Sequence, residues 1–230
     1  MQKIRNISRL IQLAVAIAVA AAAGYPQVVV DRTVATVSDG VRTELITQSD
    51  LLWQLALQPG TPLSPPTNED LRQAVQTQIN QRIFALEAER LPRPAPTEKE
   101  IADKIAELLK YFPSAAEFEK RLRTVGFTSI RDDNFEAIIS KRVAVDKYLD
   151  FRFRSFVVVT DEDESTYYRD IWVPEFRRKN PGAIVPPLDE VRKRVNEELV
   201  ESRVETSIEA FLEEAKRRVE IIALADIARN

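Results

Sequence analysis

The chain has 230 residues, 44% of them apolar and 30% charged, with a formal net charge of −3, which is typical of a soluble globular protein. It contains no cysteine and no histidine, which excludes disulfides, zinc sites of the usual kind and Ser–His or Cys–His nucleophile pairs. Its five glycines are isolated, so no phosphate-binding or dinucleotide-binding loop can be drawn. We therefore expect no metal, no cofactor and, from the bulk charge, no nucleic-acid partner.

Residues 1–23 have the layout of a secretory signal peptide. Three basic residues precede an uncharged run over residues 10–23, which ends in alanines. The run is shorter than the roughly 20 apolar residues of a transmembrane helix, and Pro26 prevents its extension as a helix. We expect a cleaved signal peptide, with an uncleaved anchor as the alternative. Cleavage removes the three positive charges, leaves a net charge of −6 and implies no stable membrane insertion.

The next part of the chain predicts a hairpin followed by helices. Residues 28–47 are rich in β-branched residues around Asp39-Gly40, a pair typical of hairpin turns. Capping residues from Thr47 begin a helix that Pro59-Gly60 ends. After a stiff proline-rich connector, residues 68–90 predict a long helix with an apolar face opposite a face of Gln, Arg and Glu. That apolar face is formed by Leu71, Val75, Ile79, Ile83 and Leu86.

Start and end signals mark three further helices. Thr97 to Glu100 and Ser114 to Glu117 each match a capping box at a helix start. Gly126 stands where a left-handed helix end requires a glycine. The apolar spacing of the following segment predicts a helix over residues 129–153.

Thr160 then begins a helix with Asp161 to Glu164 in its first turn, and we expect Pro174 to limit this helix. The stretch NPGAIVPP separates it from a long helix over residues 188–218, and residues 219–224 predict a closing strand. The expected fold class is mainly α, with a small β-sheet formed by the N-terminal hairpin and a C-terminal strand.

Three stretches, taken in order, resemble SurA-type periplasmic chaperones. DRTVATVSDGVRTELITQSDL resembles the hairpin and helix that open the mature proteins of that family. PTEKEIADKIAELLKYFPSAAEFEKRLRTVGFT and VAVDKYLDFRFRSFVVVTDEDESTYY resemble the helical remainder of the N-terminal module. PPLDEVRKRVNEELVESRVETSIEAFLEEAKRRVEIIAL resembles the C-terminal helix and strand. The resemblance implies a SurA/trigger-factor-like helical chaperone module, located in the periplasm.

The resemblance also implies a domain organisation. Residues 24–160 form the N-terminal helical region, and residues 188–230 form a helix and strand that pack back on it. Between them, residues 161–187 form a helix and a proline-rich join. Many relatives carry a parvulin-type prolyl isomerase domain at this join, and about 90 residues would be needed for one. The missing domain, together with the absence of His and Cys, implies a protein without catalytic residues that is not an enzyme.

The leading functional hypothesis is an ATP-independent holdase that binds unfolded or partly folded envelope and outer-membrane proteins. A concave helical surface can cover the apolar segments of many unrelated clients weakly. One alternative is a non-catalytic scaffold that binds a single folded partner or associates with itself. Another is residual peptidyl-prolyl cis-trans isomerase activity.

The residues proposed to contact clients are Tyr167, Tyr168, Trp172 and Phe176, beside a basic run at residues 177–179. Aromatic faces can bind apolar side chains of an extended chain, whereas the alternative is ordinary packing against the C-terminal helix.

Two other features, an acidic cluster and a tryptophan, are better explained by the fold than by ligand binding. Asp161 to Glu164 could bind Ca²⁺, but this cluster lacks the glycine and the distal glutamate of an EF-hand loop, which favours a helix start. Trp53 is expected in the core.

Overall fold

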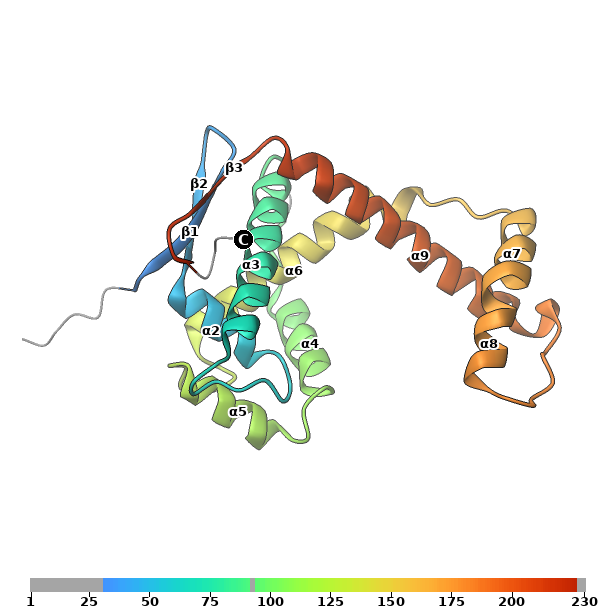
Figure 1. Cartoon of the computed structure of the whole chain (residues 1–230), viewed down its shortest axis with the longest axis horizontal. Helices are drawn as coiled ribbons and strands as arrows, with labels where there is room; N and C mark the ends of the chain where they lie inside the picture. The colour runs from blue at the N-terminus through green and yellow to red at the C-terminus, as the bar shows by residue number, and fades with distance from the viewer. Residues whose placement is uncertain (1–30, 92–93, 227–230) are drawn as a thin grey trace, which may run out of the picture. The chain divides into compact units, whose positions relative to one another are not determined.

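The computed structural model describes residues 31–91 and 94–226 (Figure 1). The predicted signal peptide, residues 1–23, lies outside the described residues. Within the described part, the protein is mainly helical and carries a small antiparallel sheet, as the sequence predicts. The strands are β1 (Thr33–Ser38), β2 (Thr43–Thr47) and β3 (Glu220–Ala223). The helical segments are α2 (Gln48–Ala56), α3 (Asn68–Ala88), α4 (Glu98–Leu109), α5 (Ala115–Thr124), α6 (Asp133–Arg152), η1 (Arg154–Phe156), α7 (Asp161–Tyr167), η2 (Tyr168–Trp172), α8 (Val173–Lys179) and α9 (Leu188–Lys216).

The sheet has the order β2-β1-β3, so the first and the last described strands are hydrogen-bonded neighbours (Figure 1). Thr36 of β1 is paired with Leu45 on one side and with Ile222 on the other. This confirms the predicted hairpin and the predicted closing strand. A register shift near the start of β1 lets the consecutive residues Val34 and Ala35 both be buried, because it interrupts the normal alternation of faces.

The turn of the hairpin spans residues 39–42 and is stabilised by Asp39. The carboxylate of Asp39 accepts hydrogen bonds from the backbone N–H groups of Val41 and Arg42, and Gly40 adopts a φ of 84°. Asp39 also pairs with Arg90, at the end of α3, at 3.1 Å. These backbone hydrogen bonds, followed by the one from Arg90, lower the pKa of Asp39 to about 2.

Threonine side chains define several helix starts. The capping boxes at Thr97 and Thr160 are present, and Thr47 and Thr67 form the same arrangement with an aspartate three residues later. The predicted box at Ser114 forms only in part: its hydroxyl accepts from the Glu117 N–H, and the described chain shows no return bond from the Glu117 side chain.

Two predicted boundaries were wrong. The helix expected from residue 129 begins at Asp133, because the Asp132 side chain accepts from the Asn134 N–H and caps it there. Pro174 does not end the helix that starts at Thr160. A π-helical turn, with the Val173 N–H bonded to the Tyr168 carbonyl, precedes the proline, which then occupies the first turn of α8. Proline is tolerated in a first helical turn, where its missing N–H is not needed.

Two clusters of buried side chains hold the described helices together. One joins the sheet, α3 and the C-terminal part of α9. The other lies among α2, α4, α5 and α6, around the aromatic rings of Phe118, Phe127 and Phe135. In the described part of the chain, no helix combines the length and the apolar character needed to cross a membrane.

The helix α9 belongs to two packing environments. Its C-terminal part places Phe211 and Ala215 in the cluster with the sheet. Its N-terminal part, which buries Val195, contacts α7 and η2. A helix of this length spans about 43 Å, so its two ends pack against different partners. The residues that α9 buries, Val195, Leu199, Val204, Phe211 and Ala215, are divided between these two environments.

We predict that Phe211→Ala lowers the free energy of unfolding by about 3 kcal/mol, because it removes a buried ring from the junction of α9 with the first cluster. The Phe211 ring is 5.4 Å from Phe153 and 6.4 Å from Phe84 between centroids. Urea denaturation measures the change. Phe156→Ala is the matched control, since Phe156 is 71% exposed and its loss should cost below about 1 kcal/mol. Equal losses of the free energy of unfolding in Phe211→Ala and Phe156→Ala would contradict this account of the junction.

Candidate functional site

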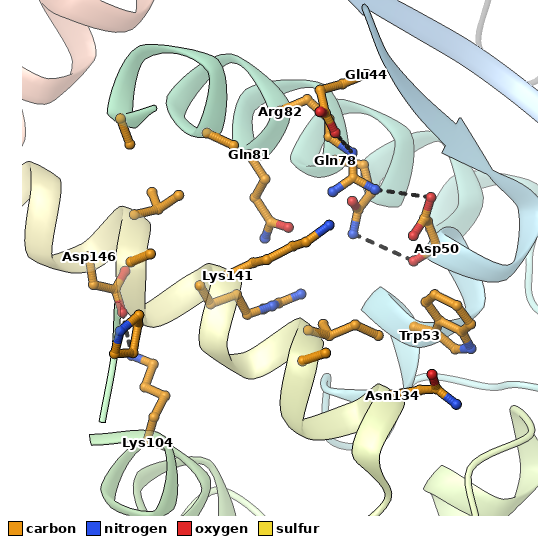
Figure 2. A pocket seen from close by; sticks show the side chains of 18 of the residues that line it. Glu44, Asp50, Trp53, Gln78, Gln81, Arg82, Lys104, Asn134, Lys141 and Asp146 are labelled. Carbon is orange, nitrogen blue, oxygen red and sulfur yellow. Dashed lines mark hydrogen bonds and ion pairs between the residues drawn. The ribbon is translucent and has the colours of Figure 1, made fainter. Parts of the chain in front are cut away.

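A groove of about 1120 Å³ lies between α2, α3, α4 and α6, with Glu44 of β2 at its rim (Figure 2). The α3 wall presents Gln78, Gln81 and Arg82, and the facing α6 wall runs from Asn134 to Lys147. Small-molecule pockets usually measure about 300–1,000 Å³, so this groove is comparable in size with the largest of them.

An ion-paired arginine forms part of the α3 wall. Arg82 contacts the Asp50 carboxylate at 3.1 Å and the Glu44 carboxylate at 3.8 Å, and its Nε donates to the Leu45 carbonyl at 3.2 Å. Asp50 also serves as the third residue of the capping box at Thr47. One carboxylate thus fixes both the start of α2 and the orientation of Arg82, whose charge is neutralised within the wall.

Buried amides connect three of the helices that form the groove. The Gln54 Oε1 atom accepts hydrogen bonds from Gln81 Nε2 at 3.3 Å and from Arg142 Nη2 at 2.5 Å. Gln78 Nε2 donates to the Asp50 carbonyl at 3.5 Å. Gln54 and Gln78 are buried, so each depends on these partners. A hydrogen-bonded network of this kind connects α2, α3 and α6 and favours one relative placement of them.

Arg142 carries a poorly compensated charge. Burial of its guanidinium lowers its pKa to about 10, with a smaller contribution from repulsion by Arg82 and an opposing attraction from Asp146. Its Nε is buried and has no hydrogen-bond partner among the described residues. Because its pKa stays well above neutrality, Arg142 remains cationic at neutral pH.

The other charged residues of α6 that line the groove differ in whether they form ion pairs. Lys141 is exposed, and its side chain extends from α6 into the space between α6 and α3 (Figure 2). Asp146 pairs with Lys104 of α4 at 3.0 Å, and Lys147 pairs with Glu100 at 2.6 Å. The hydrogen bond from Lys147, followed by those from Thr97, lowers the pKa of Glu100 to about 2. These pairs hold α4 beside α6.

Apolar side chains line the groove next to these polar groups. Trp53 donates from its indole N–H to the Val125 carbonyl at 3.2 Å, and its ring is 5.3 Å from Phe127. Trp53 was expected in the core; it is half-buried, packing on the second cluster while lining the groove. Leu108, Ile138 and Val145 add further apolar surface. The groove therefore combines amides, cations and apolar surface, which suits a ligand that carries both polar and apolar groups.

The aromatic residues proposed from the sequence lie on α7, η2 and α8, and within the described chain none of them lines the groove. Tyr168, Trp172 and Phe176 form a stacked column, with successive centroids 5.5 Å and 5.1 Å apart. Trp172 is only 3% exposed, and the guanidinium of Arg194 on α9 lies 4.8 Å from its centroid. This supports the alternative interpretation, packing against the C-terminal helix.

Other contacts of this segment agree with a packing role. The Tyr168 hydroxyl donates to the Pro186 carbonyl at 2.6 Å. Tyr167 is half-buried beside the column, and burial raises its pKa. Client binding by Tyr167, Tyr168, Trp172 and Phe176 stays a prediction.

The acidic residues at the start of α7, Asp161 to Glu164, connect this helix to α9. Asp163 closes the capping box at Thr160 and pairs with Arg203 at 2.6 Å. The buried Glu164 accepts hydrogen bonds from Arg192 and Asn196, each at 2.7 Å. These contacts favour the helix-start interpretation over Ca²⁺ binding. In the described residues, no group of three or more His, Cys, Asp or Glu side chains is arranged to hold a metal ion.

Sequence reasoning missed the groove and most of its lining. It identified the polar face of the long helix at residues 68–90, but it did not place that face opposite α6. No local signal marked them, because Gln78 and Gln81 lie among several other uncharged polar residues of the same helix.

The described residues thus form a mainly helical protein with a three-stranded antiparallel sheet and an amphipathic groove. A scan against family models finds no match to this chain, and a search of curated proteins also finds none.

We predict that acid weakens the contact between α7 and α9. The bond from Arg203, followed by those from Thr160, lowers the pKa of Asp163 to about 2, below the unfolded value of about 3.9. Its contribution to stability is therefore present above about pH 4 and is lost as the pH falls toward about 2. Trp172 fluorescence, followed in a Trp53→Phe background, measures this transition.

Asp163→Asn should weaken the contact at neutral pH and flatten the acid transition, because the charge and part of the capping box are lost. Glu162→Gln is the control, since Glu162 is exposed in the same first turn of α7. An unchanged acid transition in Asp163→Asn would contradict the assignment.

Proposed function

We propose that the protein is an ATP-independent periplasmic holdase, related to SurA-type chaperones, that binds extended segments of unfolded envelope or outer-membrane proteins. The observation that carries the proposal is the groove between α2, α3, α4 and α6. Its volume of about 1120 Å³ and its mixed polar and apolar lining have room for several residues of an extended chain.

The lining supports broad recognition. Trp53, Ile138 and Val145 offer apolar surface to client side chains, and covering apolar area is favourable by about 25 cal/mol per Å². Gln81 and Asn134 on the opposing walls can exchange hydrogen bonds with a client backbone, which every sequence carries. Contacts of this kind discriminate little between clients, which is what a holdase requires.

The rest of the fold supports the same proposal. The hairpin pairs with the C-terminal strand, which is the arrangement that the resemblance to SurA-type chaperones implies. The segment from α7 to α8 packs on α9 through its own aromatic column, so the proposed join is itself an ordered helical unit.

The test is suppression of aggregation. The purified protein, at near-equimolar ratio, should slow the light scattering of a chemically unfolded outer-membrane β-barrel protein on dilution from urea. Ala137→Trp should reduce this protection to about half or less, because Ala137 lines the groove and is exposed, so the indole occupies client space without disturbing the core.

Ala106→Trp is the matched control, because Ala106 is an exposed helical alanine that is not part of the groove lining. It should protect as well as the wild type. Absence of protection for several unrelated clients would refute the holdase proposal. Capture of one stoichiometric folded partner would favour a scaffold instead.

A further inference from the structure

We propose that the groove recognises a carboxylate of an extended polypeptide, bound by Lys141 and Arg142 of α6. This inference rests on the proposed function, because it names the chemical group that positions the client in the same groove. The argument depends on how the charges of the lining are paired.

Every acidic side chain of the lining already has a basic partner. Glu44 and Asp50 both pair with Arg82. Glu89 pairs with Arg42, and Asp146 pairs with Lys104. The groove therefore offers a bound cation no unpaired carboxylate, although Glu44 and Asp50 share a single arginine.

The basic side chains are not balanced in the same way. Arg142 and Lys141 form no ion pair with any described residue, whereas Arg82, Lys104 and Lys147 all do. The only side-chain hydrogen bond of Arg142 in the described chain goes to the neutral amide of Gln54. Its nearest acid, Asp146, attracts it but is paired with Lys104. Two adjacent cations on one wall thus lack a counter-ion.

A carboxylate is the anion that fits this arrangement. Guanidinium and ammonium groups form strong charge-assisted hydrogen bonds to carboxylates, and low exposure strengthens such bonds. Lys141 reaches into the groove from the same helix that carries Arg142 (Figure 2). Ile138 and Val145, one turn away on either side, would contact the residues that flank the carboxylate. A polypeptide supplies both groups, either at its C-terminus or at an Asp or Glu side chain.

The test measures binding of three short peptides with the same apolar-rich sequence and a neutral dye at the amino end. One has a terminal carboxylate, one has a terminal amide, and one has a terminal amide with a central Glu in place of Gln. By fluorescence anisotropy, at least one carboxylate form should bind about tenfold more tightly than the neutral peptide. Which of the two forms is preferred identifies the source of the carboxylate. Added salt should reduce the difference.

Lys141→Gln and Arg142→Gln should each remove most of this preference, whereas Lys141→Arg should keep it. Lys120→Gln is the charge control, because Lys120 is exposed on α5 and is not part of the lining. If Arg142→Gln unfolds the protein, Lys141→Gln decides alone, since Lys141 is exposed and forms no contact that folding needs.

Equal binding of all three peptides, or a preference that persists in Lys141→Gln, would overturn the inference. If the neutral peptide still binds and aggregation is still suppressed, the holdase proposal survives that result. If no peptide binds and no client is protected, both proposals are wrong.

Discussion

Antiparallel pairing between β1 and β3 is the interaction on which the described fold depends. It joins Val37 to Ile221 and Thr36 to Ile222, at opposite ends of the described chain. Closing so long a segment carries an entropic cost, which the buried cluster beneath the sheet offsets. The pairing also positions the C-terminal end of α9, so that Phe211 and Ala215 complete the cluster that α3 begins.

The groove follows from this arrangement together with a second set of contacts. Asp50 connects the start of α2 to Arg82 on α3, and Gln54 connects α2 to both α3 and α6. On the other side, the pair between Lys104 and Asp146 holds α4 against α6. Because these contacts are polar and specific, they keep the helices at a fixed separation and leave a lined space between them. Apolar packing alone would favour closer contact.

In the segment from α7 to α8, aromatic residues stabilise the fold by packing against one another and against α9. The column of Tyr168, Trp172 and Phe176 places its central ring beside Arg194 on α9, and Asp163 and Glu164 anchor the start of α7 to the same helix. This unit therefore depends on α9, and α9 in turn depends on the sheet. If the protein is the holdase that we propose, its client surface is expected where charged side chains lack a partner, as on α6.

The sequence by itself determined the features that involve residues close together in the chain. The helix start at Thr97 could be predicted because a capping box joins residues three apart, and the start at Thr160 because acidic residues fill its first turn. The helix end at Gly126 could be predicted because a left-handed backbone, here with a φ of 101°, suits glycine. The hairpin and the mainly helical class were predicted for the same reason, while the resemblance to SurA-type chaperones stays a prediction. Only the tertiary structure decided that Trp172 is buried and that Gln54 meets Arg142, 88 residues further along the chain. Local spacing shows which face of a helix is apolar, but the partner of that face and the gaps between helices depend on how distant segments pack.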